Sequence, residues 1–167
     1  MNGIRKFEKR ANNAFLHSDQ SPGKNYVWSY QGILTLTDSG ENQGGFVCVP
    51  QSHLYHQKFF QERGLMERKQ DWYKVEEEDK VKEPLCHDRK INTKAGDFIL
   101  FDSRTFHCNN VPILDNLRVC TYICMLPSEK VPEMMGEARQ KAVQEKRTSS
   151  HHPGDGFRTF EEMPAEV

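Results

Sequence analysis

The sequence lacks any long hydrophobic run. No apolar stretch approaches the roughly 20 residues that are needed to cross a bilayer, and Met1 to Lys6 lack the apolar core of a secretory signal. No internal repeat is visible either. We therefore expect a protein without a membrane partner.

An excess of charge of either sign is also absent. The 23 Lys and Arg residues are scattered among 24 Asp and Glu residues, which leaves a formal net charge of -1. This balance gives no electrostatic argument for nucleic acid as a main partner. We therefore expect no nucleic-acid partner.

The cysteines follow no recognisable pairing pattern. They are odd in number and fit neither a disulfide framework nor a CxxC zinc motif. Free thiols in a reducing compartment explain them most simply, so we expect a cytoplasmic protein. The five residues are Cys48, Cys86, Cys108, Cys120 and Cys124.

The length of the chain bounds its architecture. A chain of 167 residues can form one compact core but not two ordinary domains. We expect a single domain over residues 1–167. Its core is expected at about 15–126, and a C-terminal helix and an irregular tail at 131–167.

Most of the predicted core is β-structure. Aromatic and β-branched residues indicate strands over residues 26–37, 46–49, 98–101 and 117–126. The continuous apolar run at 98–101 favours a buried strand. In the last strand, alternation places four residues on one face, namely Arg118, Cys120, Tyr122 and Cys124. The pattern predicts a mainly β protein, a β-sandwich or jelly roll with a few flanking helices.

The other segments are helical or charged. The spacing of apolar residues predicts a helix over 54–63 that stops at Gly64, and a second helix over 131–147. Residues 65–93 are densely charged and contain the acidic run 76–79. We expect this stretch to be a solvated excursion from the core.

A His-x-Asp pair begins the candidate site. On an extended segment, His17 and Asp19 point to the same side and can reach one metal ion, while Ser18 points away. Far downstream, His107 follows a predicted strand and a turn-like stretch, which predicts a position at a strand edge facing a cavity. Two imidazoles and one carboxylate are the ligand set of a non-haem Fe(II) facial triad. Taken alone, each residue fits a surface, capping or core role better than a metal-binding one.

Arg118 and Asn109 extend this candidate site. A guanidinium that points into a barrel interior is costly without an anionic partner, and Arg can grip a carboxylate with two hydrogen bonds. Arg118 is therefore a candidate for binding the far carboxylate of 2-oxoglutarate, unless it reaches solvent from an edge strand. Asn109 could donate to the same anion, although a turn at Asn109-Asn110 is an equal alternative.

Three stretches carry a recognisable combination of motifs. They are His17-Ser18-Asp19-Gln20, residues 41–53 and residues 95–107, with Arg118 following. The second stretch contains Pro50-Gln51-Ser52-His53, which is similar to a Pro-Gly-Ser-His turn. Together they cover residues 15 to about 126 and resemble the phytanoyl-CoA dioxygenase-like family of Fe(II)- and 2-oxoglutarate-dependent oxygenases.

The resemblance implies a double-stranded β-helix, a cupin-type jelly roll, with iron at its open mouth. It implies that His17, Asp19 and His107 are the iron ligands and that Arg118 holds 2-oxoglutarate, whereas His53 is a structural or near-site residue. The implied reaction uses O₂ to hydroxylate a small-molecule substrate and releases succinate and CO₂. Related halogenases replace the carboxylate ligand by a small residue, so the presence of Asp19 favours hydroxylation.

Two other classes of function stay open at this point. One is a non-catalytic metal-binding or interaction module that has lost its substrate pocket, and the other is an enzyme that uses another divalent metal without 2-oxoglutarate. Members of the family usually carry a substantial helical region before the His-x-Asp motif, whereas sixteen residues precede His17 here. We therefore expect substrate binding to depart from the family more than metal binding does.

Overall fold

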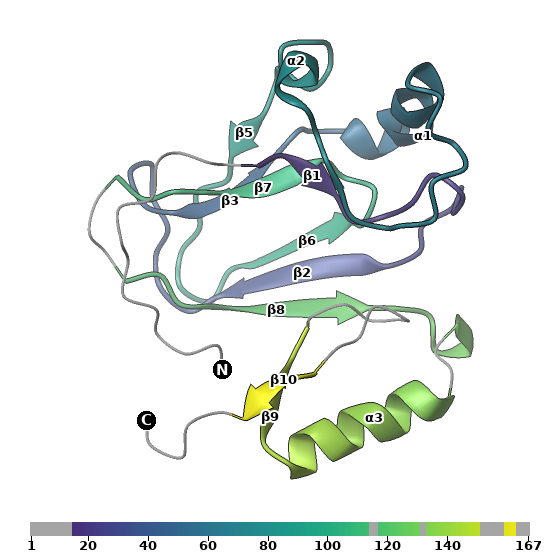
Figure 1. Cartoon of the computed structure of the whole chain (residues 1–167). Coiled ribbons are helices and arrows are strands. Elements are labelled where there is room, and N and C mark those ends of the chain that lie inside the picture. The colour runs from purple at the N-terminus through teal and green to yellow at the C-terminus, as the bar shows by residue number, and fades with distance from the viewer. Residues whose placement is uncertain (1–14, 114–116, 131–132, 151–158, 163–167) are drawn as a thin grey trace.

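The computed structural model describes residues 15–113, 117–130, 133–150 and 159–162. Its framework is two antiparallel sheets that lie one above the other (Figure 1). The five-stranded sheet has the order β4 (Tyr73–Lys74), β1 (His17–Ser18), β7 (His107–Asn110), β3 (Gly45–Cys48) and β5 (Arg89–Lys90). The three-stranded sheet has the order β6 (Phe98–Asp102), β2 (Tyr30–Thr35) and β8 (Cys120–Met125). The prediction of a mainly β protein with a few helices is therefore confirmed.

The helix predicted over residues 54–63 is present as α1 (Ser52–Glu62). Gly64 follows it with a φ of 65°, a left-handed conformation that glycine adopts without a steric penalty. Gln51, which precedes α1, also has a positive φ of 62°. The turn before α1 therefore keeps a backbone conformation that suits the glycine of the related motif, although the residue here is glutamine.

The second predicted helix is present as α3 (Glu133–Gln144), and a short 3₁₀-helix, η1 (Ser128–Lys130), precedes it. The first two residues of its predicted span, 131–132, lie outside the described residues. The prediction of an irregular tail is wrong in part, because β9 (Arg147–Ser149) and β10 (Thr159–Glu162) form a two-stranded antiparallel sheet. These strands are short and polar, so no apolar alternation marks them in the sequence.

The charged stretch 65–93 is not simply a solvated excursion, and this prediction is wrong in part. It contributes both edge strands of the larger sheet, β4 and β5, and the short helix α2 (Glu77–Lys80). Asp79, within the acidic run, is only 3% exposed and forms ion pairs with Arg63 and Lys82. Paired charges can be buried where single ones cannot, and composition alone does not reveal the pairing.

The main apolar core lies between α1 and the larger sheet. Phe59 and Phe60 from α1 meet Phe106, which precedes β7, and all three are fully buried. Their rings pack edge to face, with centroids 4.8 Å apart for Phe59 and Phe106. The opposite face of the larger sheet therefore faces the smaller sheet.

The smaller sheet is apolar on both faces, which corrects the prediction of a buried strand over residues 98–101. Ile99 and Phe101 of β6 pair with Ile33 and Gln31, residues that β2 buries between the two sheets. Phe98 and Leu100 alternate with them and are 45% and 54% exposed. A continuous apolar run cannot distinguish the two faces of a strand, because it carries no alternation.

All five cysteines are free thiols, as predicted. Among the described residues, no helix is long and apolar enough to cross a membrane.

His56 of α1 is a buried histidine that makes folding sensitive to acid. Its Nε2 atom donates to the carbonyl oxygen of Gln20 at 2.9 Å and lies 3.1 Å from the Ser18 hydroxyl. Its Nδ1 atom is buried without a hydrogen-bond partner among the described residues. Burial lowers the pKa of His56 to about 4, since a proton on Nδ1 would place a charge where no partner receives it.

We predict that acid destabilises the protein through this residue. The unfolded chain takes up a proton at His56 near pH 6.5, whereas the folded chain resists protonation down to about pH 4. The stability that depends on neutral His56 is thus complete above pH 6.5 and is lost as the pH falls toward 4, by about 2–3 kcal/mol at pH 4.5. Urea unfolding at pH 7 and pH 4.5 measures this loss, which should be smaller by that amount in His56→Gln. An equal loss in both proteins would contradict the assignment.

Candidate metal centre

The pairing of β1 with β7 brings the two predicted histidine ligands together. His17 and His107 are direct cross-strand partners, and their ring centroids are 4.3 Å apart. On β1, Leu16 and Ser18 point toward the α1 core, so His17 and Asp19 point to the other face, toward the smaller sheet. His107 lies at the first residue of β7, as predicted for a strand end.

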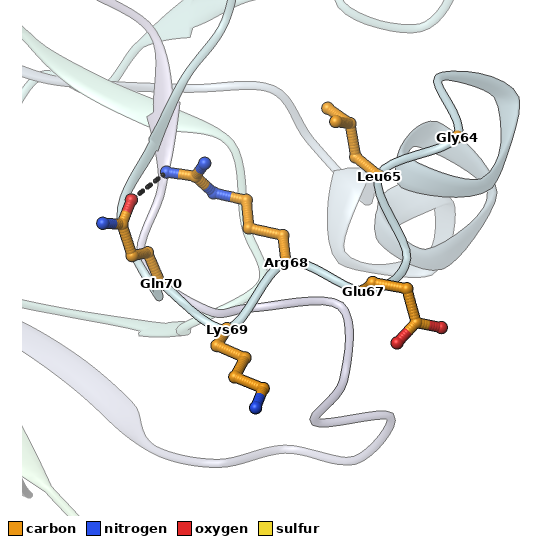
Figure 2. A pocket seen from close by; sticks show the side chains of 6 residues that line it. All are labelled: Gly64, Leu65, Glu67, Arg68, Lys69 and Gln70. Carbon is orange, nitrogen blue, oxygen red and sulfur yellow. Dashed lines mark hydrogen bonds between the residues drawn. The ribbon is translucent and has the colours of Figure 1, made fainter.

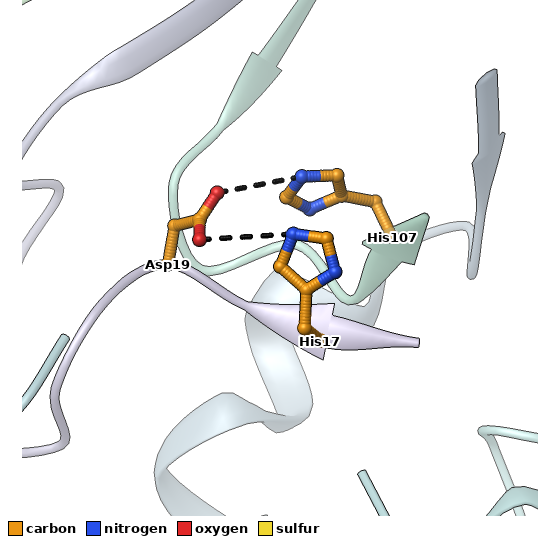
Figure 3. Close-up of side chains that lie close together, drawn as sticks. All are labelled: His17, Asp19 and His107. Carbon is orange, nitrogen blue, oxygen red and sulfur yellow. Dashed lines mark ion pairs between the residues drawn. The ribbon is translucent and has the colours of Figure 1, made fainter. Parts of the chain in front are cut away.

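The three predicted ligands converge on one point, as Figure 3 shows. The Nε2 atom of His17 lies 3.7 Å from Asp19 Oδ1, and that of His107 lies 3.4 Å from Asp19 Oδ2. Ligands at right angles around a small divalent ion, each at about 2.1 Å, are about 3 Å apart. The cluster is therefore slightly wider than a filled site and could close on an ion through small side-chain movements.

Backbone carbonyl groups set the orientation of both imidazoles. Nδ1 of His17 lies 3.0 Å from the carbonyl oxygen of Phe15, and Nδ1 of His107 lies 2.9 Å from that of Thr105. A carbonyl oxygen only accepts, so each Nδ1 carries a proton and each ring turns its Nε2 atom toward Asp19. This arrangement orients metal-binding histidines in many proteins.

Gln31 is a site residue that sequence reasoning missed. It lies on β2 of the smaller sheet, is only 5% exposed, and donates from Nε2 to Asp19 Oδ2 at 3.0 Å. A glutamine at an inward position of an otherwise apolar strand was the signal available in the sequence. The bond holds the carboxylate in the orientation in which Oδ1 faces His17 and Oδ2 faces His107.

The predicted inward face of β8 is correct. Cys124 pairs with Gln31 across the sheet and lies close enough to Asp19 to be affected by its charge. Burial, and to a smaller extent that charge, raise the pKa of the Cys124 thiol to about 12. Because Arg118 and Tyr122 have the same parity as Cys124, they also face the space between the sheets.

Arg118 lies in this space with Tyr122 and Asn109. Asn109 Nδ2 donates to the Tyr122 hydroxyl at 3.2 Å, and the guanidinium of Arg118 is also within hydrogen-bonding range of Tyr122. The Nε atom of Arg118 is buried and has no hydrogen-bond partner among the described residues. Tyr122 is the second site residue that the sequence reasoning did not single out.

A second cation lies near Arg118. Burial and, in smaller part, the charge of Arg118 lower the pKa of Lys90, although Glu41 opposes this effect. The buried guanidinium nitrogen of Arg118, unsatisfied among the described residues, suits an anionic group such as a carboxylate. The donor set thus fits both a divalent ion and an anionic co-substrate.

The sequence matches the phytanoyl-CoA dioxygenase (PhyH) family over residues 10–108, more than half of the chain. The chain belongs to this family of Fe(II)/2-oxoglutarate-dependent oxygenases. The matched residues include both strands that carry the histidine and aspartate cluster, β1 and the start of β7.

Two known proteins are similar to this member of the phytanoyl-CoA dioxygenase family over most of its length. Ava biosynthesis cluster protein O of Aspergillus versicolor is 28% identical over 149 residues, which are 82% of this chain and 47% of that protein. The crystal structure of EctD from S. alaskensis with 2-oxoglutarate and 5-hydroxyectoine has a TM-score of 0.51 and 18% identity, over 72% of this chain and 40% of EctD. Its apoform gives the same score and covers 41% of EctD.

These comparisons have two consequences. At 18% identity the likeness to EctD shows the fold alone, a mainly β cupin fold. The family member described here spans less than half the length of the relatives that it matches.

Two residues of the related motifs lie outside the metal cluster. His53 is half-buried near Asp102 and is not among the three clustered side chains. Ser18 points away from the cluster, as predicted, but it is fully buried and contacts His56. It is therefore a structural residue and not an incidental one.

A second group of potential ligands lies on the surface. Glu83, Cys86 and His87 place ligand atoms within 4.8 Å of one another, but all three are exposed. His87 and Glu83 form an ion pair at 2.7 Å, a common surface contact four residues apart. We assign no metal role to this group.

A hollow of about 350 Å³ lies in the loop between α1 and β4 (Figure 2). Its lining residues are Gly64, Leu65, Glu67, Arg68, Lys69 and Gln70. Arg68 donates to the Gln70 side chain at 2.9 Å across it. The hollow contains none of the clustered His and Asp residues, so it is separate from the candidate metal centre.

Proposed function

We propose that this chain is an Fe(II)- and 2-oxoglutarate-dependent dioxygenase that hydroxylates a small organic substrate and releases succinate and CO₂. The observation that carries the proposal is the convergence of His17, Asp19 and His107, with both Nε2 atoms facing one carboxylate. Family membership and the structural likeness to EctD, whose crystal structure contains 2-oxoglutarate, support the choice of co-substrate.

Each residue of the proposed site has a distinct task. His17, Asp19 and His107 would hold iron on one face, which leaves positions open for co-substrate and O₂. Arg118 would bind the far carboxylate of 2-oxoglutarate, with Asn109 and Tyr122 orienting it. Bound iron would supply the redox chemistry that activates O₂.

Aromatic side chains would protect this chemistry from water. Phe46 and Phe101 come from the two facing sheets, and their ring centroids are 4.6 Å apart. Both rings also contact His107, at 5.6 and 4.7 Å between centroids. They fix the imidazole and fill the space behind the ligands with apolar groups.

We also propose that the two facing sheets form the double-stranded β-helix, or cupin-type jelly roll, of the family. The position of the candidate metal centre between the two sheets and the likeness to EctD support this topology. We treat residues 1–167 as one oxygenase-like domain. The substrate is a proposal at the level of a small organic molecule, because this chain covers less than half of its relatives.

An anaerobic titration tests the proposal. Protein loaded with Fe(II) is mixed with 2-oxoglutarate in the absence of O₂, and the visible metal-to-ligand charge-transfer band is recorded. We expect a band that saturates with 2-oxoglutarate. Folded, metal-loaded protein without a band would favour a cupin-type enzyme that uses no 2-oxoglutarate, and folded protein without metal binding would favour an interaction module.

We predict that Gln31→Leu weakens metal binding. The substitution removes the donor to Asp19 Oδ2 and leaves the carboxylate free to rotate away from the imidazoles. Loss of such an outer partner typically lowers metal affinity by about 10- to 100-fold. Titration of the metal-free protein with Co(II) measures the change, with Gln57→Leu as control because Gln57 donates to the Pro22 carbonyl and to none of the three clustered side chains. Equal Co(II) affinity in the wild type and Gln31→Leu would contradict the positioning role.

A further inference from the structure

Two exposed aromatic side chains stand beside the proposed ligand His17. Phe15 is 46% exposed and Trp72 is 50% exposed. Their ring centroids lie 5.4 and 6.0 Å from that of His17, and 6.2 Å from each other. Large aromatic side chains are usually more buried than this, and their exposure next to a candidate metal ligand calls for a reason.

The pairing of β1 with β4 explains how these rings reach the site. His17 pairs with Lys74 and Ser18 pairs with Tyr73, so directly opposed side chains share a face. Tyr73 packs against the α1 core with Ser18. Trp72, two residues before Lys74, therefore projects on the face of His17, as does Phe15, two residues before His17.

The loop that ends at Trp72 is held in place by a backbone contact. The guanidinium of Arg68 donates to the Trp72 carbonyl oxygen at 2.9 Å and lies over the Tyr73 ring at 5.3 Å. The indole is therefore presented from an anchored segment. A positioned ring loses less conformational entropy on binding a ligand than a mobile one does.

The geometry of the two rings favours one class of ligand. Phe15 and Trp72 are inclined at 62° in an edge-to-face pair, and each ring keeps about half of its surface exposed. A flat ring can stack on one of them and direct its edge to the other, the two arrangements that aromatic rings prefer. The rings could also attract a cation, but the ammonium of Lys74 belongs to the same face and would oppose it.

We infer that Phe15 and Trp72 form the substrate-binding wall of this site and that it takes a planar aromatic or conjugated ring, neutral or with an anionic substituent. This inference rests on the proposed function, which makes the cluster beside the rings a reaction centre. It adds the substrate class, because a ring bound against Phe15 or Trp72 lies next to His17.

The two tryptophans of the chain allow a direct test. In ¹⁵N-labelled, metal-free protein the indole N–H signals of Trp28 and Trp72 are followed during titration with phenylacetate, and Trp72→Leu assigns them. Cyclohexylacetate is the matched probe, with the same charge and a similar size but no planar ring. We expect the Trp72 signal to move more than the Trp28 signal, with binding of cyclohexylacetate about three- to tenfold weaker.

Variants complete the test. Saturation-transfer NMR on phenylacetate should show loss of binding to Trp72→Leu and weaker binding to Phe15→Leu, while Phe98→Leu, an exposed aromatic on the outer face of the smaller sheet, binds as the wild type does. Equal binding of both probes, equal shifts of both indole signals, or full binding by Trp72→Leu would each overturn the inference. Because these measurements need no metal, they are independent of the iron and 2-oxoglutarate titration.

Discussion

His107→Ala should abolish succinate formation from 2-oxoglutarate. The substitution removes one of three clustered ligands, so the loss should exceed the roughly 10- to 100-fold effect of losing an outer-shell partner. His107 also packs against Phe46 and Phe101, so alanine leaves a cavity. His107→Gln, which keeps most of the volume, should be equally inactive. Succinate release under Fe(II) and O₂ measures both variants.

The control for this prediction is a histidine outside the cluster. His87 is exposed, and among the described contacts its side chain pairs only with the exposed carboxylate of Glu83. His87→Ala removes this side chain. It should retain wild-type turnover. Circular dichroism and thermal unfolding show whether each variant is folded. Normal succinate production by folded His107→Ala would refute the metal assignment.

Arg118→Met should raise the 2-oxoglutarate concentration needed for half-maximal turnover. Methionine keeps much of the length and apolar stem but removes a guanidinium whose buried Nε lacks a partner among the described residues. A hydrogen bond to a charged group contributes about 1.5–3 kcal/mol, which corresponds to a roughly 10- to 150-fold rise. Turnover at saturating 2-oxoglutarate should change much less, since the iron ligands are untouched.

Two further substitutions define this effect. Arg118→Lys keeps the charge without the planar fork, so it should recover part of the affinity. Arg147→Met, an exposed arginine on β9 outside the two main sheets, is the matched control and should behave as the wild type. The charge-transfer band under anaerobic conditions reports 2-oxoglutarate binding directly. An unchanged 2-oxoglutarate requirement in Arg118→Met would assign the co-substrate carboxylate to another group.

The sequence was sufficient where a property depends on neighbouring residues. Strand segments such as 46–49 and the helix that stops at Gly64 follow from local composition and turn chemistry. The common side of His17 and Asp19 follows from the period of two in an extended chain. The same period correctly placed Arg118 and Cys124 on one inward face of β8.

The sequence was insufficient where long-range pairing decides the outcome. The edge strands β4 and β5 lie in a charged stretch without alternation, so only their backbone bonds to β1 and β3 define them. Asp79 is buried because two cations from other segments reach it. The exposure of Phe98 and Leu100 likewise depends on which face of the smaller sheet meets the larger one.

The candidate site shows the same division. The sequence alone determined the ligand types, because the His-x-Asp motif and a distant His can be recognised without knowledge of the fold. Only the tertiary structure decided that His17 lies opposite His107, that Gln31 bonds Asp19, and that Trp72 lies beside His17. The side on which a residue projects is a local property of the strand, whereas the register between strands is set by contacts across ninety residues of chain.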